Sequence, residues 1–409
     1  MIFFSFRNHL ILPTLNIFMC SFFFSTADFE CKFPGFFIMR KPMRDKLILV
    51  IGVTLAIFLI LSHYSEVTDY ENIEVHPRNL VKSNEKPQRS SKVINTSSES
   101  KPAQSQIAAS QRSSPGYPQN LTSIGKQFDC GHLPILEKLN LVDNPGPFVD
   151  FKSTDEISKN IVFVSATSDN HYEQATNSIS SVYKMYPNAK FILYSLSLKE
   201  TCISQLKEKF EKIEVRVFDT SGYPDYTNNW MEYRFKPLIV AEVMKEYEYI
   251  WWMDAHISVK TAGLIEAFSK ELSENSKKTD TRVQIPIYFF IHSSHSNFAT
   301  LFKSLLTFFP TNSISLLKDP NRGAQLGANT IFFARTKYTV ETVKWWVLCA
   351  LDQKCMNPPG AQVYCRFPDN DRNTQFANCY RFDQSVLNLL MLNEFQDYKK
   401  YHSKLGSYF

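Results

Sequence analysis

The sequence predicts an α/β domain with a mostly parallel central sheet and helices on both faces, preceded by one transmembrane helix and a disordered stem. Three observations support this prediction. Short apolar runs alternate with segments of helical spacing from about residue 159 onward. A long apolar run without charges lies near residue 50, and a polar, Ser- and Lys-rich stretch separates it from the alternating region.

Residues 47–64 are the predicted transmembrane signal anchor. The run from Leu47 to Leu61 carries no charge and, extended to Tyr64, is about long enough to cross a bilayer as a tilted helix. Basic residues at 40–46 precede it and acidic residues follow, which predicts a cytosolic N-terminus and a single-pass type II topology. A cleaved signal peptide with a long basic leader is the alternative.

Two segments flank this anchor. Residues 1–46 are the predicted cytosolic segment, of which 1–38 are either an upstream extension of the reading frame or a second, poor membrane segment. Residues 65–127 form the predicted flexible stem, because they have almost no periodic apolar face with which to bury surface. Glycosylation sequons at Asn95 and Asn120 support a lumenal stem.

The alternating region follows, in a predicted lumenal domain over 128–409. Strands are expected at the apolar runs 160–165, 190–196, 213–218 and 247–253. Helices are expected between them at 171–186, 200–212 and 235–247. A strand at 330–334 and helices at 338–351 and 383–393 continue the pattern with longer loops. Trp251, Trp252, Trp345 and Trp346 fall within these apolar runs and are expected in the core.

Charge and motif content exclude several function classes. The net charge of +5 is small for 409 residues, and much of the excess lies before the predicted domain, so nucleic acid is not an expected partner. The chain has no G-x-G-x-x-G, Walker A, G-x-S-x-G or H-E-x-x-H pattern. Dinucleotide oxidoreductases, P-loop enzymes and hydrolases of these classes therefore have little support.

Cysteine usage favours an oxidising compartment. Six cysteines follow the predicted anchor, an even set that allows up to three disulfides of unreadable connectivity. The last four are spaced too irregularly for a zinc ribbon, so we expect disulfides there in preference to a metal site. The six are Cys130, Cys202, Cys349, Cys355, Cys365 and Cys379.

The strongest candidate for a site is Asp254-Ala-His256, directly after the predicted strand that ends at Met253. Ligands bind at the carboxyl ends of strands in open α/β sheets, so Asp254 is expected in a crevice. A turn or helix-capping role for Asp254 is the alternative. A histidine at a strand end can also simply bond to backbone, so both interpretations of His256 stay open.

In this arrangement the chain resembles the type II Golgi glycosyltransferases of the nucleotide-diphospho-sugar (GT-A) fold, and more narrowly an uncharacterised nematode family assigned to that superfamily. The resemblance covers roughly residues 125–400 and rests on the order of several short motifs. These are Ser178–Pro187 leading to Lys190–Tyr194, Tyr233–Pro237, Trp252–Asp254, Gly327–Phe333 and Asp383-Gln384.

The resemblance implies a GT-A-like domain with a nucleotide-binding part at about 158–260 and an acceptor-side part at about 261–409. It implies a glycosyltransferase in the Golgi or ER membrane that moves a sugar from a nucleotide-sugar donor to a hydroxyl of a glycan or glycoprotein. The alternative is a catalytically inactive GT-A-like lumenal protein that acts as a binding or scaffold module.

The resemblance also assigns donor-side roles. Asp254 matches the first carboxylate of the family's D-x-D, which contacts ribose or a metal-bound water, while His256 stands where the second carboxylate ligates the metal. Because Mn²⁺ accepts imidazole as well as carboxylate, Asp254 and His256 are the expected Mn²⁺ ligands. If no metal binds, Arg234 and Lys236 are candidates to contact the diphosphate, or they are a solvated helix start.

Further candidates lie later in the chain. Asn329, in Gly327-Ala-Asn329, is expected near the donor sugar, or it belongs to a loop entering a strand. Asp383 is the candidate catalytic residue, placed to accept or orient an acceptor hydroxyl's proton, and its alternative role is the N-cap of the following helix. His292 and His295 are late metal ligands or ordinary loop histidines.

Overall fold

The computed structural model describes residues 118–119, 123–143, 145–149, 157–278, 285–311 and 313–409. All described residues belong to one compact unit, which lies within 103–409. The predicted segment 1–46, the anchor 47–64, both sequons and most of the stem 65–127 lie outside the described residues. Among the helices that are described, none combines the length and the apolar character needed to cross a membrane.

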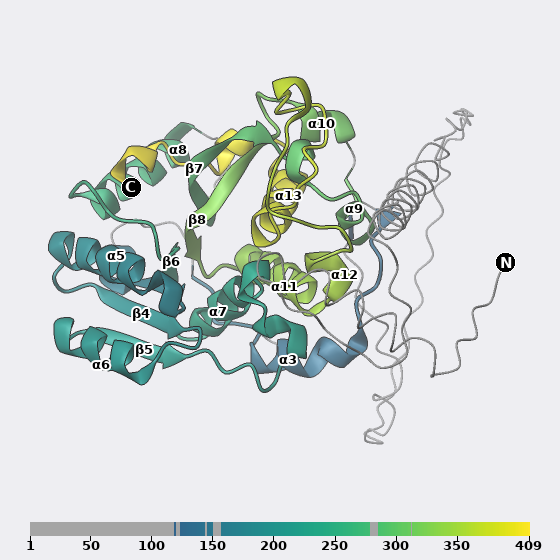
Figure 1. The fold of residues 1–409 in the computed structure, drawn as a ribbon. Helices are drawn as coiled ribbons and strands as arrows, with labels where there is room; N and C mark the ends of the chain where they lie inside the picture. Colours follow the sequence, from purple (N-terminus) through teal and green to yellow (C-terminus); the bar gives the residue numbers. More distant parts are fainter. Residues whose placement is uncertain (1–117, 120–122, 144, 150–156, 279–284, 312) are drawn as a thin grey trace, which may run out of the picture. The chain divides into compact units, whose positions relative to one another are not determined.

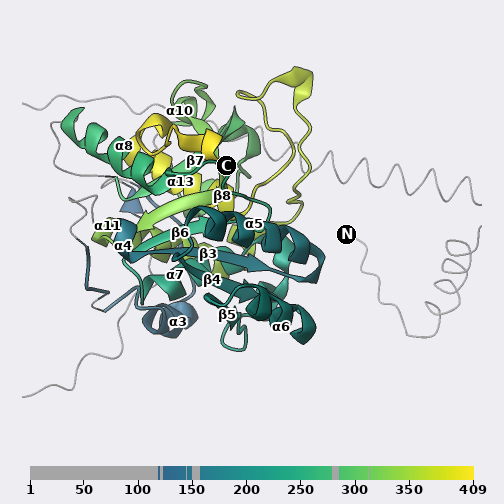
Figure 2. The ribbon, with the colours of Figure 1, turned by 90° about the vertical axis from the view of Figure 1, so that its left-hand side faces the viewer.

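The described chain is an α/β domain around a six-stranded sheet of order β5-β4-β3-β6-β8-β7, which Figure 2 shows from bottom to top. β5, β4, β3 and β6 run parallel to one another, whereas β8 is antiparallel to both β6 and β7. The strands are β3 (Ile161–Thr167), β4 (Lys190–Ser195), β5 (Ile213–Val217), β6 (Tyr249–Met253), β7 (Ile287–Ser296) and β8 (Ala324–Ala334).

The prediction of a mostly parallel sheet is confirmed for β3, β4, β5 and β6 and fails at β8, which is antiparallel to both of its neighbours, so the sheet is mixed. The physical reason is that every residue of β8 except Asn329 is buried. Burial of a strand on both faces gives no indication of its direction, so the sequence did not reveal that β8 runs against β6. A second antiparallel pair, β1 (Pro118–Gln119) with β2 (Ser123–Ile124), lies in the predicted stem.

Side chains alternate across the sheet and produce two cores. Trp251 and its neighbours on one face pack against α5, α6 and α8, while Trp252 and the opposite face pack against α7, α11 and α13. The four tryptophans expected in the core are at most 4% exposed, which confirms that prediction. The helices are α5 (Tyr172–Met185), α6 (Glu200–Lys209), α7 (Phe235–Met244), α8 (Leu264–Lys278), α11 (Lys337–Leu351) and α13 (Asp383–Phe395).

Shorter helices connect these elements. The α-helical ones are α3 (Leu133–Lys138), α4 (Ile157–Asn160), α9 (Leu305–Phe308), α10 (Ile314–Lys318) and α12 (Gln353–Met356). The 3₁₀ helices are η1 (Cys130–His132), η2 (Asp169–His171), η3 (Asp225–Asn228), η4 (Trp230–Glu232), η5 (Phe298–Thr300), η6 (Pro368–Asn370), η7 (Tyr398–Lys400) and η8 (Leu405–Tyr408). The C-terminus lies beside α8 and β7 (Figure 1).

The strand order places a topological switch point between β3 and β6. From β3 the chain adds β4 and β5 on one side and then crosses over to add β6 on the other side. Ligands bind outside the carboxyl ends of strands at such a point in open α/β sheets. Asp254 directly follows the carboxyl end of β6, so the fold puts it at this edge of the sheet.

Candidate functional site

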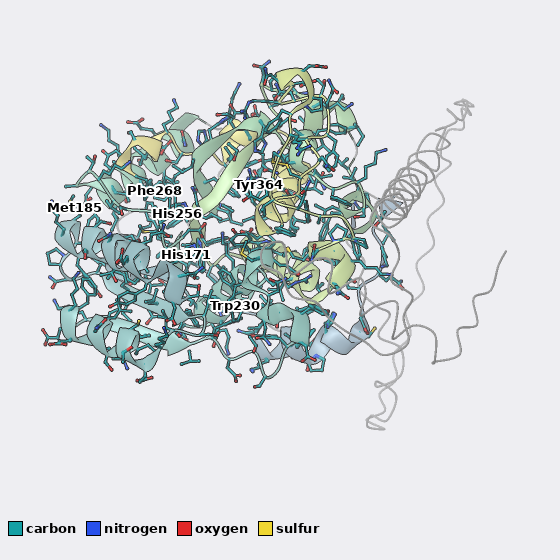
Figure 3. The ribbon with its side chains drawn as sticks, viewed as in Figure 1. His171, Met185, Trp230, His256, Phe268 and Tyr364 are labelled. Carbon is teal, nitrogen blue, oxygen red and sulfur yellow. A yellow bond between two sulfur atoms is a disulfide. The ribbon has the colours of Figure 1, made fainter. Side chains whose placement is uncertain are left out.

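A pocket of about 690 Å³ lies at the carboxyl end of β6. Asp254, His256, Lys236, Asn329 and Asp383 all line it, and its outer residues include Tyr364, which Figure 3 labels together with His256. The pocket therefore brings together five of the six predicted site residues, which are up to 147 positions apart in the sequence (383 − 236 = 147).

Asp254 reaches the pocket because the sheet ends there. Its backbone N–H donates to Asn329 O at 2.7 Å, and Ile257 N–H donates back to Asp254 O at 2.9 Å, which turns the chain away from the strand. The side chain is 21% exposed, and its Oδ1 accepts a hydrogen bond from Trp252 Nε1 at 2.7 Å. This hydrogen bond from the indole holds the Asp254 carboxylate at the carboxyl end of β6.

Lys236, in the first turn of α7, stands between two carboxylates. Its Nζ lies 3.0 Å from Asp254 Oδ1 and 2.8 Å from Asp383 Oδ2, and it donates to Ala328 O at 2.9 Å. The side chain is only 3% exposed. Burial alone would lower the pKa of Lys236, but the attraction of Asp254 and Asp383 outweighs it and holds the pKa above its ordinary value. The ammonium group therefore stays charged at neutral pH.

Asp383 is the first residue of α13, and its side chain is 5% exposed. Burial raises the pKa of Asp383 to about 6, and the nearby charge of Lys236 limits the rise. Trp346 Nε1 donates to the backbone O of Asp383 at 3.0 Å, which anchors the residue at the helix start. The N-cap position belongs to Phe382, so helix capping does not account for an aspartate here.

Arg234 differs from its sequence-based expectation. Its buried guanidinium pairs with Glu232 and donates to Ala350 O at 2.6 Å and Asp352 O at 3.1 Å. It does not line the pocket, so the predicted phosphate contact has no geometric basis. Instead, Arg234 ties the start of α7 to the C-terminal end of α11.

Asn329 and His256 both line the pocket but differ in burial. The buried Oδ1 of Asn329 accepts no hydrogen bond from any described residue. His256 is exposed. By contrast, His292 and His295 lie on β7, where each ring Nδ1 is engaged by local backbone, Ser294 N–H at 2.9 Å and Ser296 O at 3.1 Å.

The predicted Mn²⁺ site does not fit this geometry. The described residues contain no group of three or more His, Cys, Asp or Glu side chains that could hold a metal ion. Asp254 Oδ1 already accepts the Lys236 ammonium and the Trp252 indole, and a dication on the same carboxylate would lie close to a fixed positive charge. Lys236 thus already supplies a cation to Asp254, the first of the two predicted metal ligands.

Sequence reasoning did not identify the aromatic and basic side chains that the loop between α12 and α13 contributes to the pocket. Tyr364, Arg372 and Arg381 line the pocket, and Tyr364 is 82% exposed at its rim. Neither guanidinium forms a salt bridge with a carboxylate in the described part of the chain; that of Arg372 lies over the Phe367 ring, 4.5 Å from its centroid. In the sequence, the cysteines at 365 and 379 indicated that this loop is cross-linked.

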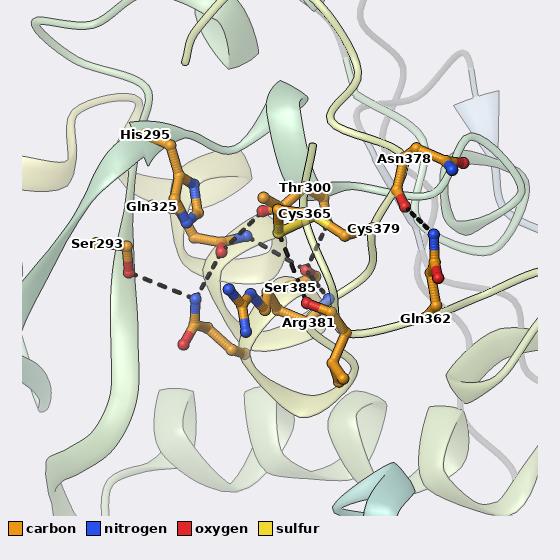
Figure 4. Close-up of a disulfide and its surroundings, with 12 residues drawn as sticks. Ser293, His295, Thr300, Gln325, Gln362, Cys365, Asn378, Cys379, Arg381 and Ser385 are labelled. Atoms are coloured by element: carbon orange, nitrogen blue, oxygen red, sulfur yellow. Dashed lines mark hydrogen bonds between the residues drawn. A yellow bond between two sulfur atoms is a disulfide. The ribbon is translucent and has the colours of Figure 1, made fainter. Parts of the chain in front are cut away.

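The last four cysteines form two disulfides, as their irregular spacing predicted in preference to zinc binding. Cys349 is bonded to Cys355, and Cys365 to Cys379, with the second bridge closing the pocket loop (Figure 4). Cys365 itself lines the pocket. The cross-link therefore fixes the segment that carries Tyr364 and Arg372.

A buried polar network holds the start of α13 against β8 (Figure 4). Gln384 Nε2 donates to Gln325 Oε1 at 2.6 Å, and Ala328 N–H donates to Gln384 Oε1 at 3.2 Å. Thr300 Oγ1 also donates to Gln325 Oε1, at 2.9 Å, and Ser385 Oγ donates to Thr300 O at 2.9 Å. Because these groups satisfy one another, the backbone around Asp383 is fixed relative to the sheet.

Comparison with known families gives one match. The model of a family described as a protein of unknown function, DUF1647, matches residues 115–241. That stretch ends within α7, before Asp254. No curated protein matches the sequence significantly.

Similar solved structures include several sugar-transferring enzymes. The galactosyltransferase LgtC in complex with donor and acceptor sugar analogs has a TM-score of 0.29 at 11% identity, over 56% of this chain and 70% of that one. Core-mannan synthase A (CmsA/Ktr4) from Aspergillus fumigatus, in its Mn/GDP form, gives 0.35 at 11%, over 70% and 84%. The bifunctional glycosyltransferase WbbM gives 0.33 at 15%, over 61% of this chain and 45% of its own. Likenesses this low do not establish a function for this chain.

Proposed function

We propose that this protein is a glycosyltransferase that moves a sugar from a nucleotide-sugar donor to a hydroxyl of a glycan or glycoprotein. One observation carries the proposal: Asp254 and Asp383 meet through Lys236 in a single pocket at the carboxyl end of β6. Paired carboxylates and a fixed cation at this edge of an α/β sheet suit a reaction that binds hydroxyls, moves a proton and releases an anion.

The donor side of the site follows from its charges. Transfer breaks the bond between the anomeric carbon and a phosphate oxygen, and the departing nucleoside diphosphate gains negative charge. A carboxylate without a bridging cation repels a diphosphate, so Asp254 accepts hydrogen bonds from hydroxyls of the donor. The Lys236 ammonium, 3.0 Å from Asp254, compensates charge inside the pocket. Asn329 lines the same pocket, and its backbone O accepts the N–H of Asp254.

The acceptor side is assigned to Asp383. The new bond joins the acceptor oxygen to the anomeric carbon, and the hydroxyl proton must leave. With a pKa of about 6, the Asp383 carboxyl is mostly ionised at pH 7 and takes that proton. Tyr364, exposed at the rim of the same pocket, offers an aromatic face to the acceptor.

The proposed location is the Golgi or ER membrane, with the C-terminal domain in the lumen and the anchor at 47–64. Two disulfides in the described domain support an oxidising compartment, since such bonds are rare in the cytosol. The anchor itself lies outside the described residues.

A second candidate is a lumenal binding protein without catalysis. The observation that favours it is that Lys236 pairs with both carboxylates, while an exposed histidine stands where the resembled D-x-D has its second carboxylate. In that case the pocket would bind a nucleotide sugar and leave it intact.

Release of nucleoside diphosphate from a panel of nucleotide sugars, with a broad panel of glycan acceptors, separates the two. The transferase proposal expects acceptor-dependent release that Asp383→Asn lowers by about 10²-fold or more, whereas Lys199→Gln, an exposed change, leaves it unchanged. Binding without release across the panel would favour the non-catalytic protein. No binding of any nucleotide would contradict both.

A further inference from the structure

We propose that Arg372 and Arg381 bind the diphosphate of the nucleotide donor in place of a divalent metal ion, so that the protein binds its donor without metal. This inference rests on the proposed function and specifies how the donor's charge is neutralised. It starts from the disagreement between the expected Mn²⁺ and the residues that line the pocket.

Charge balance in the pocket requires further cations. Asp254 and Asp383 supply two carboxylates, and Lys236 supplies one ammonium that contacts both. This trio is net negative when both carboxylates are ionised, so by itself it would repel a diphosphate. Arg372 and Arg381 are the other charged residues that line the pocket, and with them its net charge becomes positive.

Both guanidiniums are available to an anion. Arg372 is exposed and Arg381 is half-buried, and neither forms a salt bridge with an acidic side chain anywhere in the described ranges. Arg372 stacks on Phe367, which occupies the face of the guanidinium and leaves its in-plane N–H groups for ligands. Planar, bidentate donors of this kind match phosphate oxygens.

The two arginines also converge on one space. A second, smaller pocket of about 280 Å³ is lined by Arg372, Arg381 and His295, and it shares Asn329 and Gln384 with the main pocket. Burial, together with the charges of Arg381 and Arg372, lowers the pKa of His295 to about 4. His295 is therefore neutral at pH 7 and adds no charge, which leaves the arginines as the anion-binding groups.

Their backbone is held in place before any ligand arrives. Ser296 N–H on β7 donates to Arg372 O at 2.9 Å, and Arg381 N–H donates to Ser385 Oγ at 3.2 Å. The Cys365–Cys379 disulfide closes the loop 365–379, which contains Arg372 and ends two residues before Arg381 (Figure 4). An anion site preorganised in this way loses little entropy on binding.

The test is isothermal titration calorimetry of the purified full-length protein with UDP and GDP, first in EDTA and then with Mn²⁺. We expect binding in EDTA that Mn²⁺ does not strengthen, and a loss of about tenfold or more in affinity for both Arg372→Gln and Arg381→Gln. Arg366→Gln is the matched control, because Arg366 is exposed on the same loop but does not line the pocket. Unchanged thermal midpoints would show that the variants are folded.

The outcomes separate this inference from the proposed function. Binding that requires Mn²⁺, or that both arginine variants retain at full strength, would overturn metal-free binding by Arg372 and Arg381 and leave the transferase proposal standing. No binding of either nucleotide, with or without Mn²⁺, would overturn both. Inorganic pyrophosphate is the second probe. If pyrophosphate binds with higher affinity than UDP and GDP, and this binding depends on Arg372 and Arg381, the site belongs to a diphosphate of another source. That result would contradict the donor assignment.

Discussion

The ammonium nitrogen of Lys236, at the start of α7, lies 2.8 Å from Oδ2 of Asp383, at the start of α13. The same nitrogen lies 3.0 Å from Asp254 Oδ1, so one buried lysine joins the carboxylate at the end of β6 to the carboxylate at the start of the last long helix. The donor and acceptor sides of the proposed reaction are therefore linked through a single side chain.

Replacing Lys236 by Met is expected to destabilise the protein by about 3–5 kcal/mol, because removing one partner of a buried ionic group leaves the carboxylates uncompensated. Chemical denaturation measures the change. The control is Lys199→Met, which removes an exposed pair with Asp169 and is expected to cost about 0–1 kcal/mol. An equal effect of the two substitutions would show that Lys236 is not the buried bridge described here.

The acid limb of the pH–rate profile is expected near pH 6, where the Asp383 carboxyl takes up its proton and the base is lost. Because the charge of Lys236 lowers the pKa of Asp383, Lys236→Gln is expected to move this limb to higher pH. The measurement is kcat/KM against pH for both proteins. A limb that stays in place in Lys236→Gln would remove Asp383 from the role of base.

The same group links stability to pH. The folded pKa of Asp383 is about 6 against an ordinary value of 3.8, so the folded state binds this proton more tightly than the unfolded state. The protonated Asp383 carboxyl therefore adds to the free energy of unfolding below pH 3.8, and this added stability is lost as the pH rises through 6. In Asp383→Asn, we expect no such fall in the free energy of unfolding between about pH 4 and 6. Denaturation curves across that range that parallel those of the unsubstituted protein would contradict the assignment.

Arg234→Met is expected to lower stability by about 3–5 kcal/mol without changing the nucleotide affinity of the folded protein. The reason is that the Arg234 side chain is fully buried against Glu232 and the end of α11, outside the pocket. Thermal denaturation and titration calorimetry measure the two effects separately. A fall in affinity at unchanged stability would restore the phosphate contact that the sequence suggested.

Removing the Cys365–Cys379 bridge with Cys365→Ser and Cys379→Ser is expected to cost about 2–4 kcal/mol in stability and to weaken nucleotide binding. Binding weakens because the loop that carries Arg372 loses its cross-link. The Cys349→Ser and Cys355→Ser pair is the control, because that bridge lies outside the pocket. Equal losses of affinity in both pairs would mean that the pocket loop has no special dependence on its own disulfide.

Tyr364→Ala is expected to raise KM for the acceptor several-fold while leaving donor affinity and stability unchanged, because the side chain is 82% exposed at the pocket rim. Tyr364→Phe should retain the aromatic face and behave like the unsubstituted protein. Steady-state kinetics with donor and acceptor varied in turn make the distinction. A change in donor KM alone would place Tyr364 on the donor side instead.

The alternating part of the fold could be predicted because its signals are local. Apolar runs and helical spacing predicted β3 through β6 and the helices between them to within a few residues, and a proline after α5 marked the end of that helix. The reversed direction of β8 was not predictable, since strand direction is set by the path of the chain through long loops. The length of β8, from Ala324 rather than Thr330, was missed because Ala, Gly and Gln at its start carry little strand propensity.

Position in the pocket was predictable where a residue followed a strand or began a helix. Asp254 and Asp383 were placed there in that way, and Lys236 through its neighbourhood in the sequence, while their roles stay predictions. The sequence could not separate the roles of Arg234 and Lys236, which are two residues apart at the start of α7. Their directions are set by tertiary packing, because Arg234 donates to α11 and Lys236 donates to β8. Arg372 and Arg381 lie on an irregular loop, where no periodicity predicts which side chains face the pocket.

The central claim is that the Asp254 carboxylate faces a bound nucleotide sugar, and a thermal-shift screen of UDP-, GDP- and CMP-sugars against the full-length protein tests it most directly. The account predicts that at least one donor raises the melting temperature, that Asp254→Asn abolishes this rise, and that Asp219→Asn, an exposed aspartate away from the pocket, retains it. An equal rise in Asp254→Asn and the unsubstituted protein, or no rise with any donor, would contradict it.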